Sequence, residues 1–150
     1  MSDIENWNIL GTFVRIVSDG TSCGGGDLLD AIVPPGGGTP RHVHSLESEC
    51  FYVIEGTLTF DVGGKVVHAH AGTLVQGPPG VPHAFRNETA TPARIISTSF
   101  PGQRHANFLR ELGERLPQSA TSASPVEYTQ DLASKIARVS EKYGIRVLGE

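Results

Sequence analysis

The sequence predicts an all-β fold, a sandwich or barrel of short strands, with helices after it. The chain of 150 residues contains 18 Gly and 10 Pro, which are typical of tight turns. Between residues 9 and 100 they separate short apolar or alternating runs with almost no helical period, a pattern typical of all-β sandwiches and barrels. A chain of this length favours one domain with one core.

Each apolar run predicts one strand, and the residues between the runs predict the turns. A Gly-rich loop is expected over residues 18–27, and Glu55-Gly56 and Gly63-Gly64 are expected to form hairpin turns. The expected strands, in chain order, cover residues 10–17, 28–33, 49–54, 57–62, 66–71, 74–76, 83–86 and 94–100.

The last third of the chain predicts two helices. Residues 106–116 carry apolar side chains at helical spacing, and the Ser/Thr/Ala/Pro stretch 119–125 is typical of a surface connection. A second, amphipathic helix is indicated by Leu132, Ile136, Val139 and Tyr143. Gly144 is expected to end this helix, and residues 145–148 are expected to form a terminal strand.

The C-terminal part is too short for a core of its own. We therefore expect residues 1–116 to form the barrel with the first helix, and residues 117–150 to form a connection and a helix that packs on the barrel, within one domain. From their position alone, the C-terminal helices are expected to act as a lid over the barrel mouth. Deleting residues 130–150 tests this hypothesis.

Charge and hydropathy exclude several classes of partner. The net charge is −4, and no basic patch is visible, so nucleic acid is not an expected partner. No apolar run is long enough to span a bilayer, and the start of the chain does not resemble a signal peptide. We expect a soluble protein located in the cytoplasm. Cys23 and Cys50 are then expected to be free thiols, although a bridge between them stays open.

One group of side chains indicates a metal site. His42 and His44 are two residues apart, so an extended chain places both imidazoles on one face. Glu49 opens the next strand and His83 opens a later one. Three neutral imidazoles and one carboxylate suit a borderline divalent ion such as Fe, Ni, Co, Mn, Cu or Zn. Four protein ligands also leave room for water or substrate.

The spacing around these residues matches two known motifs. The first is Gly36-x5-His42-x-His44-x4-Glu49-x6-Gly56, and the second, after a gap of 15 residues, is Gly72-x5-Pro78-x-Gly80-x2-His83-x3-Asn87. Both match the two cupin motifs at every specified position. The chain therefore resembles the cupin superfamily, in particular the small single-domain bacterial cupins, over most of residues 9–100.

The resemblance implies a double-stranded β-helix, the jelly-roll barrel of cupins, with one divalent metal ion near one mouth. The family's ligands carry over to His42, His44, Glu49 and His83. Asn87 is expected to be a turn or strand-end residue. The motif glycines are expected at turns where a Cβ would clash. A homodimer is the expectation from the family.

The remaining histidines and one glutamate are expected to lie outside the site. His105 is expected to be a surface or satisfied core residue. His68 and His70 form a second His-x-His pair, but the alternation of their strand places them on the solvent side. Glu47 lies close to Glu49, but the motif spacing selects Glu49, so Glu47 is expected to be a solvated loop carboxylate.

The parity of the strands predicts which side chains line the barrel interior. Cys50 and Tyr52 are expected to point away from it. An apolar, aromatic lining beside a metal suits a flat organic substrate, so a small molecule is the expected partner. The expected pocket residues are Phe51, Val53, Leu58, Phe60 and Phe85.

The cupin fold alone does not determine the reaction. The first hypothesis is a dioxygenase that acts on a small aromatic or enol substrate, because the chain resembles cupins grouped with quercetinases. In that case Glu49 is both a ligand and the general base, which requires a raised pKa. The alternatives are a non-redox metal-dependent isomerase, cyclase or lyase, and a binding module without turnover.

Overall fold

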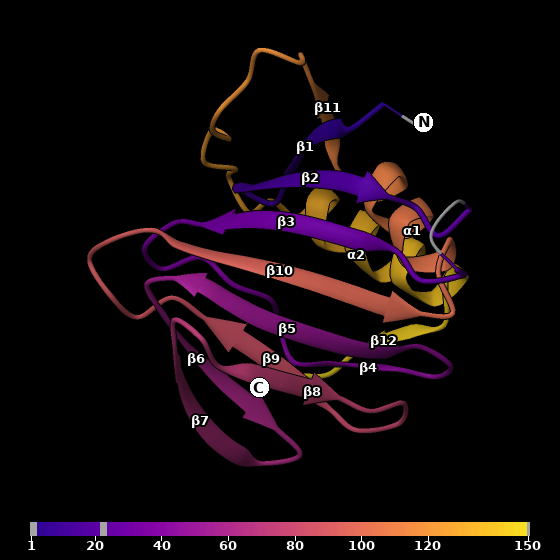
Figure 1. Cartoon of the computed structure of the whole chain (residues 1–150). Helices are drawn as coiled ribbons and strands as arrows, with labels where there is room; N and C mark the ends of the chain where they lie inside the picture. The colour runs from indigo at the N-terminus through magenta and orange to yellow at the C-terminus, as the bar shows by residue number, and fades with distance from the viewer. Residues whose placement is uncertain (1–2, 22–23, 150) are drawn as a thin grey trace.

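The computed structural model describes residues 3–21 and 24–149. Strands and two helices follow one another along the chain (Figure 1). The strands are β1 (Glu5–Ile9), β2 (Thr12–Ser18), β3 (Leu28–Val33), β4 (His42–His44), β5 (Ser48–Glu55), β6 (Thr57–Val62), β7 (Lys65–His70), β8 (Leu74–Gly77), β9 (His83–Arg86), β10 (Ala93–Phe100), β11 (Glu114–Leu116) and β12 (Ile145–Val147). The helices are α1 (Arg104–Leu112) and α2 (Gln130–Lys142).

The strands form two antiparallel sheets that pack against each other as a barrel. The larger sheet has the order β11-β1-β2-β3-β10-β5-β8, and the smaller one has the order β12-β4-β9-β6-β7. In Figure 1 both helices lie behind β2 and β3. The predicted all-β fold with C-terminal helices is confirmed.

The core lies between the two sheets because the strands alternate between buried and more exposed residues. Val53 of β5 and Ile95 of β10 come from the larger sheet, and Leu58 and Phe60 of β6 come from the smaller one. Each of these side chains is at most 2% exposed. Burial of one such side chain contributes roughly 1.5–3 kcal/mol, so this shared core helps to hold the two sheets together.

The expected strands agree with the structure at residues 28–33, 57–62 and 83–86, but the start of the barrel differs. Leu10 and Gly11 have φ angles of 52° and 88° and form the turn between β1 and β2, so the strand predicted from residue 10 begins at Thr12. Strand β1 was not predicted because Asn6 and Asn8 give it the composition of a loop. Both are buried, and their side-chain amides donate to backbone carbonyls of residues 117–124.

The first helix is shorter than predicted. It ends at Leu112 rather than residue 116, and Gly113 caps it with extended backbone. The next three residues form β11, which pairs with β1 at the edge of the larger sheet. The apolar spacing that predicted the helix does not continue here, since Glu114 and Arg115 are exposed and Leu116 is only partly buried.

The C-terminal residues are part of the barrel. Helix α2 begins after Thr129, whose side chain accepts a hydrogen bond from the Leu132 N–H. Its apolar face, which includes Ile136 and Val139, packs against Leu112 of α1. Strand β12 then pairs with β4 in the smaller sheet. No helix among the described residues is long and apolar enough to cross a membrane.

The motif glycines occupy turns, but mostly for a different reason from the predicted one. Gly36, Gly56, Gly72 and Gly80 all have positive φ, between 73° and 91°. Only at Gly56 would a Cβ also crowd a neighbour, at 2.9 Å from the Cα of Ala93. The left-handed backbone conformation, rather than lack of space, therefore requires glycine at the other three positions.

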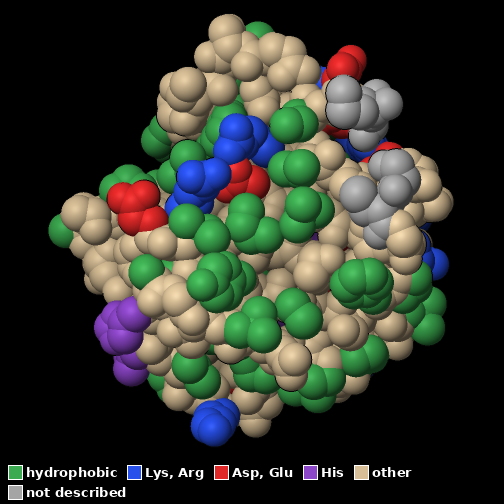
Figure 2. Space-filling view, in the orientation of Figure 1, with side chains coloured by type: hydrophobic (Ala, Val, Ile, Leu, Met, Phe, Trp, Pro, Cys, Tyr) green, Lys and Arg blue, Asp and Glu red, His purple; other side chains and the backbone are tan. Residues whose placement is uncertain are grey.

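The outer face of the larger sheet carries a cluster of opposite charges. Figure 2 shows basic and acidic side chains gathered over β2 and β3. Asp30 is 4% exposed, forms an ion pair with Arg15, and accepts two hydrogen bonds of 2.9 Å from Arg94. Burial raises the pKa of Asp30, but the hydrogen bonds from the two arginines outweigh burial and lower that pKa below 3.8. The carboxylate thus joins β2, β3 and β10.

We predict that Asp30→Asn lowers the free energy of unfolding by about 1–3 kcal/mol at pH 7, because it removes charged hydrogen bonds from a buried group. The pKa of Asp30 is lower in the folded state, so this loss is complete above pH 3.8 and shrinks as the pH falls through the folded-state pKa. Urea unfolding at several pH values measures it. The control Glu111→Gln removes an exposed pair with Lys142 and has a much smaller effect. Equal losses in the two variants would contradict the prediction.

Candidate metal centre

Four side chains from three strands meet in the barrel interior. His42 and His44 lie on β4, and His83 lies directly opposite His42 on β9. Glu49 comes from β5 of the other sheet. One potential ligand atom from each of the four lies within 4.8 Å of the other three, a group that could hold one metal ion.

One carboxylate oxygen lies at the centre of this group. Glu49 Oε2 lies 2.8 Å from His83 Nε2, 3.1 Å from His44 Nε2 and 4.0 Å from His42 Nε2. Glu49, His44 and His83 are at most 2% exposed, and His42 is partly buried. Glu49, His44 and His83 are therefore removed from water, so their polar atoms need partners inside the protein.

The backbone orients two of the three imidazoles. His42 Nδ1 lies 2.8 Å from the carbonyl oxygen of Pro40, and His83 Nδ1 lies 3.1 Å from that of Val81. A carbonyl can only accept, so each Nδ1 carries the proton and each Nε2 keeps its lone pair for the centre. Gly77 leaves space for the His83 ring, because a Cβ at this position would lie 3.1 Å from it.

The residues present fit a divalent metal ion. Neither ring nitrogen of the buried His44 has a hydrogen-bond partner among the described residues. Burial lowers the pKa of His42 to about 4, which favours the neutral imidazole that a metal requires. Burial raises the pKa of Glu49, but the nearby imidazoles of His105, His44 and His83 outweigh burial and hold that pKa well below its ordinary value. The site thus offers one carboxylate and three imidazoles, and the backbone orients the Nε2 atoms of two of these imidazoles.

Glu47 is not the solvated carboxylate that the sequence predicted. It is 1% exposed, Oε1 accepts a 3.0 Å hydrogen bond from Arg104 of α1, and Oε2 lies 3.6 Å from His44 Nδ1. Arg104 also donates to the carbonyl oxygen of Tyr143, at the end of α2. Glu47 is therefore the group behind His44, and Arg104 connects it to both helices. No spacing in the sequence indicates this contact, since it depends on the path of α1.

His105 also belongs to the site, which sequence reasoning missed. Its Nδ1 lies 2.8 Å from Ser99 Oγ and 3.3 Å from Glu49 Oε1, and the ring stacks on Phe108. Behind it, the buried Asp27 lies 3.9 Å away, and burial raises the pKa of this carboxyl. The helical period contained a signal, because residues 105, 108, 109 and 112 share one face of α1.

The other predictions on histidine and cysteine can be checked in part. His68 and His70 are exposed on β7, where their Nδ1 atoms pair with Thr59 and Thr57, so the prediction that they face solvent is confirmed. Cys50 is a free thiol. Cys23 lies outside the described residues.

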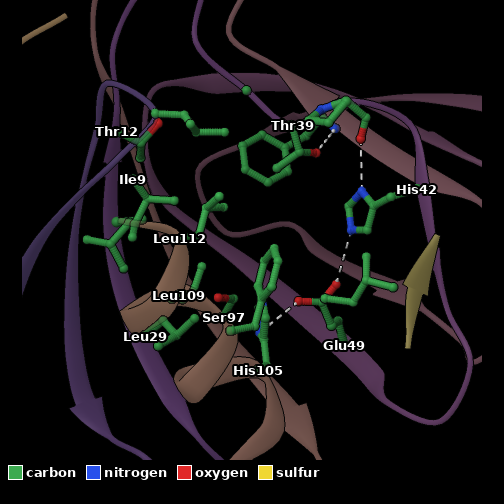
Figure 3. A pocket seen from close by; sticks show the side chains of 18 of the residues that line it. Ile9, Thr12, Leu29, Thr39, His42, Glu49, Ser97, His105, Leu109 and Leu112 are labelled. Atoms are coloured by element: carbon green, nitrogen blue, oxygen red, sulfur yellow. Dashed lines mark hydrogen bonds and ion pairs between the residues drawn. The ribbon is translucent and has the colours of Figure 1, made fainter. Parts of the chain in front are cut away.

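A mostly apolar cavity of about 130 Å³ adjoins the His/Glu cluster. Figure 3 shows His42, Glu49 and His105 on one side of it and Ile9 and Leu112 across from them. Among the predicted pocket residues, Phe51 and Phe85 line the cavity. Three of the predicted pocket residues do not line the cavity. They are 0% exposed and belong to the hydrophobic core: Val53, Leu58 and Phe60.

Other elements also contribute to the cavity wall, and the prediction from strand alternation did not contain them. Val14 of β2 and Leu29 of β3 contribute from the larger sheet. Leu109 contributes from α1, and Ile136 and Ser140 contribute from α2. Sequence parity within strands could not assign these residues, because the helices approach from outside the barrel motifs.

A comparison with protein families identifies the central part of the chain. Residues 29–99 match the family described as cupin domain. This part of the chain is therefore a cupin domain, and the predicted double-stranded β-helix is confirmed. An uncharacterized protein of Methanocaldococcus jannaschii is 31% identical over 78 residues, which are 52% of this chain and 62% of the relative. The chain thus matches less than two thirds of that relative's length.

Solved structures show the same fold. An uncharacterized conserved protein with a double-stranded β-helix domain from Klebsiella pneumoniae is 25% identical, with a TM-score of 0.54, over 61% of this chain and 78% of that one. A protein described as a predicted oxalate decarboxylase from Thermotoga maritima is 23% identical, also with a TM-score of 0.54, over 64% of this chain and 90% of that one. The latter likeness concerns the fold alone.

We predict that the purified chain binds one divalent ion and that His83→Ala weakens binding by at least about 100-fold, because it removes one of four converging donors. Metal bound only to the folded state also stabilises it, by about 2.7 kcal/mol at a free metal concentration 100 times the Kd. Calorimetry with Co²⁺ or Ni²⁺ and thermal unfolding measure both effects. His68→Ala removes an exposed histidine and leaves them unchanged. An unaltered Kd in His83→Ala would refute the site.

We predict that Glu47→Gln weakens metal binding about 10-fold while the chain stays folded, because His44 loses the carboxylate behind its ring. The same metal titration measures the change, and circular dichroism verifies the fold. Glu141→Gln neutralises an exposed glutamate of α2 and serves as the matched control. A Glu47→Gln Kd equal to that of the control would show that Glu47 does not support His44.

Proposed function

We propose that this chain, with its cupin domain at residues 29–99, is a metal-dependent dioxygenase acting on a small aromatic or enol substrate. The observation that supports the proposal best is the buried cluster of His42, His44, Glu49 and His83 on the wall of a mostly apolar cavity. The cluster offers one ion four protein donors, which suits the borderline metals Fe, Ni, Co, Mn and Cu. A substrate oxygen in the cavity can reach the same centre.

The chain's own residues hold the reacting groups and exclude water. When bound, a divalent ion would supply a Lewis acid and, if redox-active, a route for electrons between an enolate and O2. The rings of Phe51 and Phe85 line the cavity beside the cluster, at 5.8 Å from each other. Such a wall suits a flat ring and keeps bulk water from its reactive carbon.

Glu49 is the candidate general base, under a defined condition. The sequence hypothesis required a raised pKa for this role, whereas the neighbouring imidazoles hold the pKa of Glu49 well below its ordinary value despite its burial. A carboxylate with such a low pKa takes a proton only from a strongly acidified hydroxyl, as a hydroxyl on a divalent cation is. The two oxygens of Glu49 have different neighbours. Oε2 faces His83, whereas Oε1 lies 3.4 Å from Ser99 Oγ and 3.3 Å from His105 Nδ1.

We predict O2 uptake by protein loaded with Fe²⁺, Ni²⁺, Co²⁺, Mn²⁺ or Cu²⁺ when catechol is added. The reason is that a hydroxyl with an adjacent electron-rich carbon can meet the cluster from the apolar cavity. An oxygen electrode measures uptake, and mass spectrometry with ¹⁸O2 detects two labelled atoms in the product. His83→Ala lowers the rate by at least about 100-fold, and His68→Ala leaves it unchanged.

The alternatives give different results in the same assay. A non-redox isomerase, cyclase or lyase forms product equally well under nitrogen and with Zn²⁺. A binding module gives a thermal shift with the ligand and no product. Either result, together with no O2 uptake for any of the five metals, would contradict the dioxygenase proposal.

A further inference from the structure

The second oxygen of the Glu49 carboxylate meets a hydroxyl and an imidazole that are not part of the ligand cluster. Ser99 Oγ of β10 donates a 3.4 Å hydrogen bond to Glu49 Oε1. His105 Nδ1 of α1 lies 3.3 Å from the same oxygen (Figure 3) and 2.8 Å from Ser99 Oγ. Ser99 is 0% exposed and the side chain of His105 is 11% exposed. Three polar atoms thus lie within 3.4 Å of one another, largely removed from water.

The charge of the carboxylate determines which atoms of this group carry protons. A carboxylate that binds a metal ion is ionised, so its oxygens only accept hydrogen bonds. An unprotonated His105 Nδ1 would direct its lone pair toward this negative oxygen, which is unfavourable, so Nδ1 carries a proton. Nδ1 then donates to Ser99 Oγ, and the single proton of the serine is directed to Glu49 Oε1. The three side chains form a chain of hydrogen bonds that ends on one oxygen.

Asp27 holds Ser99 at this place. Asp27 Oδ1 accepts a 2.8 Å hydrogen bond from the Ser99 N–H, and the Asp27 N–H donates a 3.2 Å hydrogen bond to the Ser99 carbonyl oxygen. The other oxygen of this buried carboxyl, Oδ2, lies 3.9 Å from His105 Nδ1. The backbone of Ser99 is therefore fixed on both sides, and its hydroxyl only has to rotate toward Glu49.

The ring of His105 is held by two other rings. It stacks on Phe108, one turn later on α1, with 6.1 Å between the ring centroids, and it meets His44 edge-on at 5.5 Å. His105 and Asp27 both lie outside residues 29–99, the part that matches the cupin domain. Contacts from outside this domain therefore reach one of its candidate metal ligands.

We propose that Ser99 and His105 are positioning residues of the metal centre, which hold Glu49 Oε1 so that Oε2 is the oxygen presented to a divalent ion. Oε2 is the oxygen that lies 2.8 Å from His83 Nε2 and 3.1 Å from His44 Nε2. Without the two donors, the carboxylate is free to rotate and to offer both oxygens to the ion. The inference goes beyond the proposed function, because it applies equally to redox chemistry, non-redox chemistry and binding without turnover.

The visible absorption of bound Co²⁺ tests this inference without turnover, because its bands report the number and arrangement of the ligands. Ser99→Ala removes the hydroxyl that donates to Oε1. We expect a changed Co²⁺ spectrum and about a 10-fold weaker affinity, the usual size of effect for a group that orients a metal ligand. Ser97→Ala removes another buried hydroxyl two residues earlier on β10 and, as the matched control, leaves the spectrum and the affinity as in the wild type.

Two variants of His105 separate the hydrogen bond from packing. His105→Asn keeps an N–H donor close to the place of Nδ1, and His105→Leu fills the space without a donor. We expect the asparagine variant to retain the wild-type Co²⁺ spectrum and the leucine variant to give that of Ser99→Ala. A merely structural role would instead lower the melting temperature of both variants and leave the spectrum of the bound ion unchanged.

Three outcomes would overturn the inference. They are a Ser99→Ala spectrum and affinity equal to those of Ser97→Ala, an asparagine variant that behaves like the leucine variant at position 105, and a wild-type chain that binds no Co²⁺. If Ser99→Ala unfolds, the two His105 variants decide. Absence of O2 uptake leaves these measurements unaffected, so the inference and the proposed dioxygenase activity fail separately.

Discussion

The burial of one carboxylate among three imidazoles is the constraint on which the rest of the structure depends. Glu49 is 2% exposed, and its Oε2 faces His44 and His83 at 3.1 and 2.8 Å. Removing these groups from water is costly unless each has a partner. The partners come from both sheets, since Glu49 lies on β5 of the larger sheet and the histidines lie on β4 and β9 of the smaller one. A closed barrel satisfies this requirement, whereas neither sheet could do so alone.

The C-terminal segment contributes to the same constraint from behind. Strand β12 pairs with β4, so Ile145 lies beside His44 and Val147 lies beside His42. Arg104 holds both Glu47 and the carbonyl oxygen of Tyr143. The helices, proposed from the sequence as a lid, are thus joined to the strand of the His-x-His pair by backbone pairing and by a charged side chain. In this structure they form part of the cavity wall.

The sequence predicted the local parts of the site better than the parts that depend on packing. The spacing of His42, His44, Glu49 and His83 could be recognised because strand alternation and turn glycines determine where such side chains point. The roles of Glu47 and His105 could not, because both depend on how α1 lies against the barrel. Strand β1 was missed for a related reason, since its buried asparagines are satisfied by carbonyl groups more than 100 residues away.

Residues outside the metal cluster form most of the cavity wall. Val53, Leu58 and Phe60 are 0% exposed and fill the interior, so changing them would open voids in the core. The inner faces of α1 and α2, in contrast, meet the cavity. The same double-stranded β-helix can therefore surround a similar ligand set beside a different cavity wall, because the added helices contribute to that wall.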